Sequence, residues 1–403
     1  MGNNGVSVIA DLHCHYPLHL LPSAKRNIAG LILSQQGRWR LLDRIRAMLV
    51  HTASRLGNYR SFDSGPRVTV PAMRAGDVGV ALSALLVPFD EMDISLSYPS
   101  LPRPHYTESL RRQIGEVELD IARQDGVRIA HDPAELDAII AAGDLAVVHC
   151  IEGGFHLGGT PELVVAAVRE MAEKGIAYIT PAHLFWRGVA TNCNAIPFLP
   201  DWLYNFLWPQ PDSGLSHLGH AAVRTMVEEG VLVDISHMSE RAVHDTFAVL
   251  DRMDPGRTVP VMASHVGFRF GRQDYNLDEA TVRRIVDRDG VIGLIIAQHQ
   301  MADGLDYSPR GRFRASFGLL RQHIDRIAAI AGSYRHIAIG SDFDGYIKPT
   351  LAGLEDSSHL GALEPALAAV YGADNATAIA SGNVLRLLRG HWRRRPPAVS
   401  VPA

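Results

Sequence analysis

Short runs of apolar, β-branched residues alternate along the chain with longer stretches in which apolar residues recur every three or four positions. The first pattern is typical of buried strands and the second of amphipathic helices. The strand-like segments are Val6–Leu12, Gly79–Val87, Leu145–Ile151, Ala177–Thr180, Val231–Ile235, Val259–Ala263, Val291–Ile295 and Ile337–Ile339. The helical segments are Glu162–Lys174, Gly219–Glu229, Glu240–Leu250, Asp278–Arg288 and Phe317–Ala331.

This order of elements predicts an α/β protein with a parallel sheet. Repeated strand–helix units join parallel strands through right-handed crossovers, and eight strands are the number that a (β/α)8 TIM barrel needs. An open, doubly wound sheet would show the same alternation, so the position of the polar residues must separate the two folds. We expect a single barrel domain over residues 1–390.

Three segments depart from the repeat. Residues 25–60 carry arginines on a helical pattern and predict an inserted helix outside the barrel, for which a solvated basic face is the plainer interpretation and a binding role the alternative. Residues 195–216 contain four prolines, which predict an irregular loop whose aromatic side chains pack on the barrel or line a pocket, packing being the plainer interpretation. The tail 391–403 has the composition of a disordered segment.

Composition narrows the classes of partner. The chain has 403 residues, of which 47% are hydrophobic and 20% charged, and its net charge of −4 gives no positive field for a nucleic acid. The sequence shows no long uncharged apolar run and no leader pattern at the N-terminus. Three widely spaced cysteines make a disulfide framework an unfavoured interpretation. We therefore expect a cytoplasmic protein without a membrane or nucleic-acid partner; the oligomeric state stays open, a homodimer included.

Metal-binding side chains follow the ends of six of the predicted strands. They are His13 and His15, then Glu152, His183, His237, His265 and Asp342. A single histidine of this kind is more often a hydrogen-bonded structural residue than a metal ligand. Six strands that end in such residues favour a metal site instead. The carboxyl ends of all strands of a parallel barrel meet at one mouth, which favours the barrel over the open sheet.

The number of these side chains suits two divalent cations. Glu152 is the natural bridge, because a carboxylate has two oxygens to offer. Zinc is the first choice for imidazole and carboxylate ligands, with manganese, iron or cobalt as alternatives. Asp342 is also a candidate acid/base that takes a proton from the attacking water and delivers it to the leaving amine. An acidic turn at Gly340–Gly345 is the alternative explanation of its motif, and it is the weaker one because the motif follows an apolar strand, as the histidines do.

Two further patterns concern the first strand. Regular strand alternation would put Asp11, His13 and His15 on one face and Leu12 and Cys14 on the other. Cys14, like Cys150, is close enough to the predicted ligands for a thiolate ligand to be considered. A small buried hydrophobic residue is the more common role of a strand cysteine, so neither is included in the predicted site.

Several motifs, in this order and spacing, resemble the membrane dipeptidase (renal dipeptidase) family of the amidohydrolase superfamily. They are Ile151-Glu152-Gly153-Gly154, Thr180-Pro181-Ala182-His183, Gly214-Leu215-Ser216, Val233-Asp234-Ile235-Ser236-His237, Ala263-Ser264-His265, Ile339-Gly340-Ser341-Asp342-Phe343-Asp344-Gly345 and Gly382-Asn383-Val384-Leu385-Arg386. The resemblance implies a barrel with two zinc ions that cleaves dipeptides, with L- or D-residues at the C-terminal position.

Carried over by position, the resemblance also implies a role for each site residue. His13, His15 and Glu152 would hold one metal ion, and Glu152, His237 and His265 the other. Asp342 would act as acid/base, and His183 would contact and polarise the scissile carbonyl.

The sequence departs from the family at two positions. His15 stands where the family usually has aspartate, which makes the predicted centre one charge more positive and should weaken cation retention. Tyr275 stands before Asn276-Leu277, where the family has the arginine that binds the substrate carboxylate, and Arg269 and Arg272 are nearby but shifted. Either arginine could supply that contact, so the predicted substrate-binding residues are His183, Arg269, Arg272 and Tyr275.

Two other functions stay open. One is an amidohydrolase that acts on N-acyl amino acids, cyclic amides or lactones through the same metal ions. The other is a metal-binding homologue without turnover, which is the less favoured because every predicted ligand position holds a residue able to bind metal.

Overall fold

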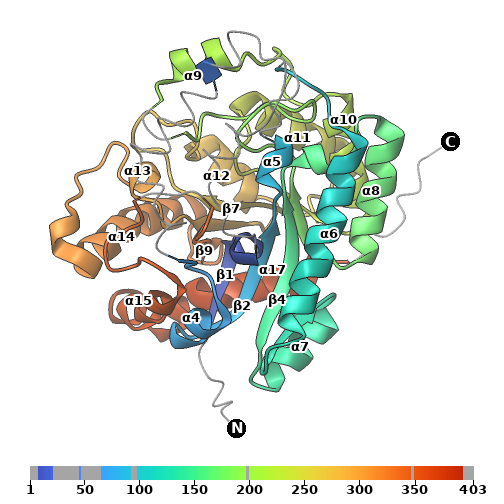
Figure 1. Ribbon diagram of the computed structural model, residues 1–403. Coiled ribbons are helices and arrows are strands. Elements are labelled where there is room, and N and C mark those ends of the chain that lie inside the picture. Colours follow the sequence, from blue (N-terminus) through green and yellow to red (C-terminus); the bar gives the residue numbers. More distant parts are fainter. Residues whose placement is uncertain are drawn as a thin grey trace.

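The computed structural model describes residues 8–20, 45–46, 65–91, 98–196, 199–345 and 349–393 (Figure 1). Eight parallel strands close into a barrel, as the sequence predicts, because β1 pairs with β9 and β2 pairs with β4. The barrel strands are β1 (Ile9–Cys14), β2 (Val78–Leu85), β4 (Leu145–Glu152), β5 (Tyr178–Thr180), β6 (Leu232–Asp234), β7 (Val261–Val266), β8 (Val291–Leu294) and β9 (Ile337–Ile339).

A ninth strand, β3 (Val127–Ala130), was not expected from the sequence. It pairs with the first half of β4, from Leu145 to Val148, on the edge whose second half pairs with β5. Its four residues are too few to show an apolar period, so hydrophobic patterning gives no signal for it.

Helices surround the barrel (Figure 1). The α-helices are α4 (Val70–Ala75), α5 (Pro88–Glu91), α6 (Pro104–Ile121), α7 (Pro133–Ala141), α8 (Pro161–Glu173), α9 (Asp201–Leu207), α10 (His217–Glu229), α11 (Glu240–Met253), α12 (Glu279–Val286), α13 (Gln298–Met301), α14 (Arg312–Ala331), α15 (Leu363–Tyr371), α16 (Ala373–Thr377) and α17 (Asn383–His391). Short 3-10 or π turns are η1 (Tyr16–Leu20), η3 (Gly154–Leu157), η4 (Pro309–Gly311), η5 (Ser357–Ala362) and η6 (Ala378–Gly382).

All five helices expected from the sequence are present, with ends displaced by a few residues. Side-chain caps fix four of their starts: Thr160, Ser216, Ser239 and Asp278 accept hydrogen bonds from the first turns of α8, α10, α11 and α12. Among the described residues, no helix is long and apolar enough to cross a lipid bilayer.

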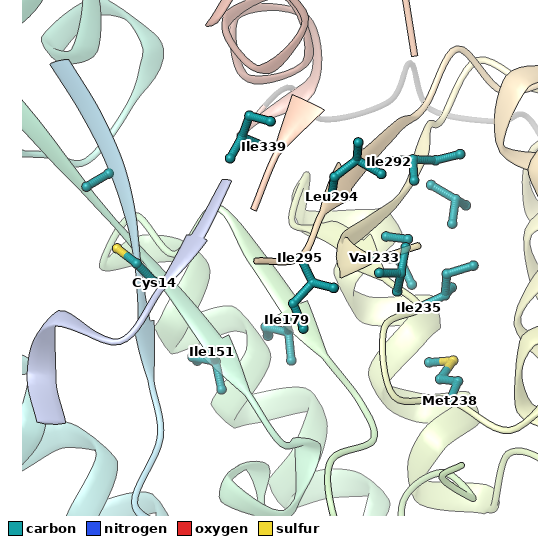
Figure 2. Close-up of a cluster of buried hydrophobic side chains, with 14 of the residues drawn as sticks. Cys14, Ile151, Ile179, Val233, Ile235, Met238, Ile292, Leu294, Ile295 and Ile339 are labelled. Carbon is teal, nitrogen blue, oxygen red and sulfur yellow. The ribbon is translucent and has the colours of Figure 1, made fainter. Parts of the chain in front are cut away.

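The barrel has an outer and an inner hydrophobic core. In the outer core, side chains such as Ile151, Ile179 and Val233 lie on successive strands (Figure 2) and pack with helix residues. In the inner core, alternate residues of β4 meet side chains of the other strands and Trp392, the residue that follows α17. The backbone N–H of Arg393 donates to the carbonyl of Gly230, just before β6, so α17 covers the amino ends of the strands. The carboxyl ends are left for the site.

The segment 195–216 differs in part from the expected irregular loop, because it contains α9. Tyr204 and Trp208 are buried and pack together with Phe185, as the packing interpretation expects, whereas Trp202 and Phe206 are 72% and 69% exposed. Of the expected insertion at 25–60 only residues 45–46 are described, and residues 394–403 of the expected tail lie outside the described part of the chain.

Candidate metal centre

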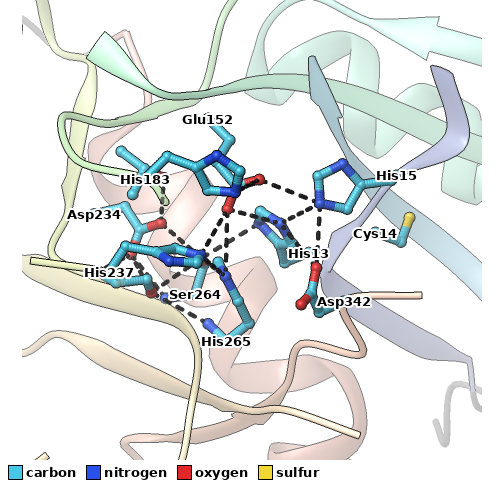
Figure 3. A network of polar contacts seen from close by, with 12 residues as sticks. His13, Cys14, His15, Glu152, His183, Asp234, His237, Ser264, His265 and Asp342 are labelled. Carbon is cyan, nitrogen blue, oxygen red and sulfur yellow. Dashed lines mark hydrogen bonds and ion pairs between the residues drawn. The ribbon is translucent and has the colours of Figure 1, made fainter. Parts of the chain in front are cut away.

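Five histidines surround the carboxylate of Glu152, the last residue of β4 (Figure 3). All six side chains are buried. The Nε2 atoms of the histidines lie close to the two Glu152 oxygens: His13 at 3.5 Å, His15 at 3.2 Å, His183 at 3.2 Å, His237 at 3.2 Å and His265 at 3.3 Å. Residues from five different strand ends thus meet in one cluster, as the sequence predicts for a barrel mouth.

Irregular strand ends direct two of these histidines into the cluster. The register of β1 on β2 shifts between Asp11 and Cys14, and that of β7 on β8 shifts between Ala263 and Val266. Such irregularities re-aim side chains near active sites. The expected regular alternation along the first strand is therefore wrong in detail: Leu12 lies in the inner core, whereas Cys14 lies in the outer one.

Asp342 joins the cluster from the turn that follows β9. Its Oδ1 atom lies 3.1 Å from Nε2 of His15 and 3.7 Å from Nε2 of His13. The residue has a φ of 56°, in the left-handed region, and its N–H donates to the carbonyl of His13. Gly345 leaves room for it, because a Cβ there would overlap Asp342 Oδ1 and lie 2.7 Å from Cδ2 of His15.

Hydrogen bonds at the far side of the rings determine which nitrogen faces the cluster. Nδ1 of His13 lies 2.7 Å from the hydroxyl of Tyr178, which donates to the carbonyl of Leu12. Nδ1 of His265 lies 2.7 Å from Oγ of Ser264, which donates in turn to Asp234. Because both hydroxyl protons are already directed elsewhere, each Nδ1 must donate, and each Nε2 keeps its lone pair for a metal ion.

Asp234 organises the second of these chains. Its Oδ1 accepts from the N–H and hydroxyl of Ser236 and from the N–H of Ser264. Its Oδ2 accepts from the hydroxyls of Thr180 and Ser264, each at 2.6 Å. Burial raises the pKa of Asp234, and the hydrogen bonds from Ser264 and Thr180 oppose that effect.

The residues present fit a metal ion. Among the described residues, no donor makes a well-directed hydrogen bond to either oxygen of Glu152. The Nε2 atoms of His237 and His265 are only 2.9 Å apart and those of His13 and His15 3.2 Å apart. Two lone pairs directed at each other would repel unless a proton or a cation lies between them. Buried imidazole nitrogens with an uncommitted carboxylate are a donor set that suits zinc.

Three groups of donors lie within 4.8 Å of one another: His13 with His15 and Glu152, Glu152 with His183 and His237, and His13 with His265 and Asp342. The first group is the one expected for one metal ion. In the second, His183 stands beside Glu152 and His237, where the sequence reasoning expects His265, although His265 also lies close to both. His183 is therefore positioned either to face a substrate or to bind a metal.

The cluster shifts the pKa values of its members in opposite directions. Burial raises the pKa of Glu152, but His183 and His13 more than reverse this and hold it well below its usual range. Burial opposes the charged form of His15, yet Asp342 and Glu152 raise the pKa of His15 to about 10. Burial raises the pKa of Asp342 to about 6, although His15 opposes the shift. Since His15 must lose its proton to bind a metal, loading of this site depends on pH.

The three other residues predicted to bind substrate have different surroundings. Tyr275 is buried beside His237, with ring centroids 5.1 Å apart, and its hydroxyl donates to the carbonyl of His265. Arg269 is paired with Glu240 and, at 3.3 Å, with Asp274. Arg272 is exposed. The guanidinium of Arg269 is thus already neutralised by carboxylates of the same protein.

Sequence reasoning missed the residues that support the histidines. Glu91 is fully buried and its Oε2 lies 2.6 Å from Nδ1 of His183. It follows the end of β2 by six residues, so an extension of the rule that identified the other strand-end residues would have included it. Asp234 and Ser264 stand within motifs already singled out, but their neighbours on other strands determine their roles.

Comparison with known proteins identifies the family and the fold. The model of the membrane dipeptidase family (peptidase family M19) matches residues 33–394. An uncharacterized dipeptidase of Schizosaccharomyces pombe is 30% identical over 61% of this chain and 54% of its own length. A dipeptidase of Aspergillus oryzae is 25% identical over 64% of this chain and 52% of its own. The alignments therefore span about half the length of these relatives.

Two solved structures share the fold over nearly the whole chain. The dipeptidase AC, a metallopeptidase of family M19, has a TM-score of 0.68 at 20% identity and covers 96% of this chain and 100% of its own. A metallopeptidase from Rhodobacter sphaeroides, liganded with a phosphinate mimic of the dipeptide L-Ala-D-Ala, has a TM-score of 0.69 at 19% identity, with coverage of 96% and 99%.

A parallel barrel with histidines and carboxylates gathered at the carboxyl ends of its strands is the architecture of barrel metallohydrolases. Within that class, the chain belongs to the membrane dipeptidase family, peptidase family M19.

Proposed function

We propose that the protein is a metal-dependent hydrolase that cleaves the amide bond of L,L or L,D dipeptides. The observation that carries the proposal is the convergence of five imidazole Nε2 atoms on the Glu152 carboxylate, with Asp342 beside them. Family membership supports the class of reaction, and the phosphinate dipeptide mimic bound by the Rhodobacter sphaeroides structure supports the class of substrate.

The donor set supports the following assignment of ligands. His13, His15 and Glu152 would hold one divalent cation, and Glu152, His237 and His265 the second, with zinc as the first choice for both. Two such cations supply an activated water and stabilise the charge that develops on the attacked group.

The remaining residues handle the substrate and the proton. Asp342 takes the proton of the attacking water at Oδ1 and delivers it to the leaving amine, a role that suits its raised pKa of about 6. His183 directs Nε2 into the cluster and polarises the scissile carbonyl. The ring of Tyr275 forms a wall beside His237, and Arg269 and Arg272 are the candidates for binding the substrate carboxylate.

Metal analysis and a substrate panel test the proposal together. The purified protein should carry close to two transition-metal ions per chain and should hydrolyse members of a panel of L,L and L,D dipeptides. Removal of the metal with a chelator should abolish turnover, and added zinc should restore it. Protein without bound metal, or loaded protein that cleaves none of the dipeptides, would refute the proposal, and the latter result would favour a homologue without turnover.

Asp342→Asn is the matched control for chemistry as opposed to folding. The side chain keeps its size but can no longer accept the proton, so we expect wild-type metal content with kcat lowered by at least a hundredfold. A variant with wild-type kcat would remove Asp342 from the mechanism.

A second candidate is hydrolysis of N-acyl amino acids, cyclic amides or lactones at the same centre. The pairing of Arg269 with Glu240 and Asp274 favours it, because a substrate carboxylate would have to compete with two carboxylates of the protein for that guanidinium. Turnover of these compounds, together with no hydrolysis of any dipeptide in the panel, would favour this function over dipeptide hydrolysis.

A further inference from the structure

The carboxylate of Glu91 is buried, so it needs a hydrogen-bond or ion-pair partner within the protein. Glu91 is the last residue of α5, and its side chain is 1% exposed, whereas that of its partner His183 is 4% exposed. Oε2 of Glu91 lies 2.6 Å from Nδ1 of His183. A buried carboxylate that accepts a hydrogen bond from a histidine ring in this way fixes the orientation of the ring.

The surrounding chain holds Glu91 itself in place. Its second oxygen, Oε1, accepts from the backbone N–H of Phe185 at 3.0 Å. Its backbone carbonyl accepts from Nε of Arg187 at 2.7 Å and from Nη2 of the same guanidinium. The loop that carries His183 therefore binds Glu91 at three points, and the carboxylate has little freedom to move away from the ring.

We propose that Glu91 is a positioning residue that holds the His183 ring so that Nε2 faces the substrate side of the metal-binding cluster. The inference rests on the proposed function of His183 in polarising the scissile carbonyl. Glu91 does not touch the substrate; it acts only through Nδ1 of His183, which must donate because a carboxylate only accepts. The opposite edge of the ring, 3.2 Å from Glu152, is then available to the reaction.

Glu91→Gln and Glu91→Ala remove this support in two steps. The glutamine keeps the shape but can satisfy only one of the two donors, Nδ1 of His183 or the N–H of Phe185. We expect kcat to fall about tenfold in Glu91→Gln and about a hundredfold in Glu91→Ala, with KM within about twofold of the wild type. Asp254→Asn weakens the partly buried pair with Arg288, and its partners are Arg288, Thr258 and Val259 rather than members of the cluster. It controls for general loss of stability and should leave kcat unchanged.

Two further measurements separate positioning from a merely structural role. In the background of His183→Gln, the change Glu91→Gln should cause no further loss of kcat, because both act through one contact. The metal content of Glu91→Gln should stay at the wild-type value. Additive losses, wild-type kcat in Glu91→Gln, or loss of metal in parallel with kcat would each overturn the inference, the last because it would make His183 a metal ligand.

A spectroscopic readout keeps this inference distinct from the proposed function. In protein labelled with 15N-histidine, the Nδ1–H signal of His183, assigned with His183→Gln, should be present in the wild type and shifted in Glu91→Gln. Loaded wild-type protein that cleaves no dipeptide would refute the proposed function, whereas the NMR comparison would still decide whether Glu91 holds the ring. An unshifted signal would overturn the role of Glu91.

Discussion

Asp234→Asn should weaken metal binding although Asp234 makes no contact with the metal-binding cluster itself. The amide nitrogen cannot take the place of Oδ1, which faces the fixed backbone donors of Ser236 and Ser264 at 3.1 and 2.9 Å. It must take the place of Oδ2, where the hydroxyls of Thr180 and Ser264 now donate. Both hydroxyls must then turn and accept.

The substitution at Asp234 affects His265 through the hydroxyl of Ser264. When the Ser264 hydroxyl turns, its proton is directed at Nδ1 of His265, 2.7 Å away, and the ring proton must move to Nε2. That nitrogen lies 3.3 Å from Glu152 and is the one expected to bind metal. Loss of such a supporting contact lowers metal affinity about 10- to 100-fold, or about 1.4 to 3 kcal/mol.

Competition with a chromophoric chelator measures this loss for each of the two ions. Asp234→Asn should release one ion at a 10- to 100-fold lower chelator concentration than the wild type. Thr180→Val is the matched control, because it removes one donor to Asp234 and leaves the chain from Ser264 to His265 intact. Wild-type retention of both ions in Asp234→Asn, or an equal loss in Thr180→Val, would refute the reasoning.

Three further changes test other parts of the site and the fold. His15→Asp should retain cations more tightly and shift the onset of activity to higher pH, because the centre becomes less positive; unchanged metal occupancy with an unchanged acidic limb of the pH–rate profile would contradict this. Gly345→Ala should lower kcat/KM about a hundredfold, since the added Cβ displaces Asp342; steady-state assays that return the wild-type value would show that the turn adapts. His149→Leu should flatten the pH dependence of the free energy of unfolding. Burial lowers the pKa of His149 to about 4, so on acidification the unfolded chain binds a proton at a higher pH than the folded protein does. The wild type therefore loses about 2 kcal/mol of stability between pH 7.5 and 5. Urea unfolding at both values checks this, with His244→Leu at an exposed site as control; equal losses in wild type and His149→Leu would contradict it.

The sequence was sufficient for the barrel and for the members of the cluster. Apolar runs of four to eight residues mark buried strands, and the carboxyl ends of parallel strands meet whatever the details of packing. His13, Glu152 and His237 could therefore be grouped although they stand far apart in the chain. The carboxylate Glu91 follows the same rule but stands six residues beyond β2, at the end of α5, so it does not directly follow a strand.

The orientation of individual side chains could not be predicted in this way. The register shift in β1 breaks the expected alternation between Leu12 and Cys14, and β7 has a further shift before Val266. No residue type in these strands predicts either shift. Likewise, the direction of the Ser264 hydroxyl depends on Asp234 and Thr180 from two other strands. Such contacts exist only once the barrel has closed.

Closure of the barrel between its first and last strands also determines when the site is completed during folding. Asp11 on β1 accepts from the N–H and hydroxyl of Ser341 beyond β9, and the N–H of His15 donates to the carbonyl of Phe343. The ligands from the start of the chain and the carboxylate from its far end therefore become neighbours only after residue 343 has been synthesised. A nascent chain that lacks β9 can bring His13 beside Glu152 through the pairing of β1 with β2 and of β2 with β4, but it lacks Asp342 and the contact that holds His15. The complete set of donors should accordingly exist only after synthesis and closure.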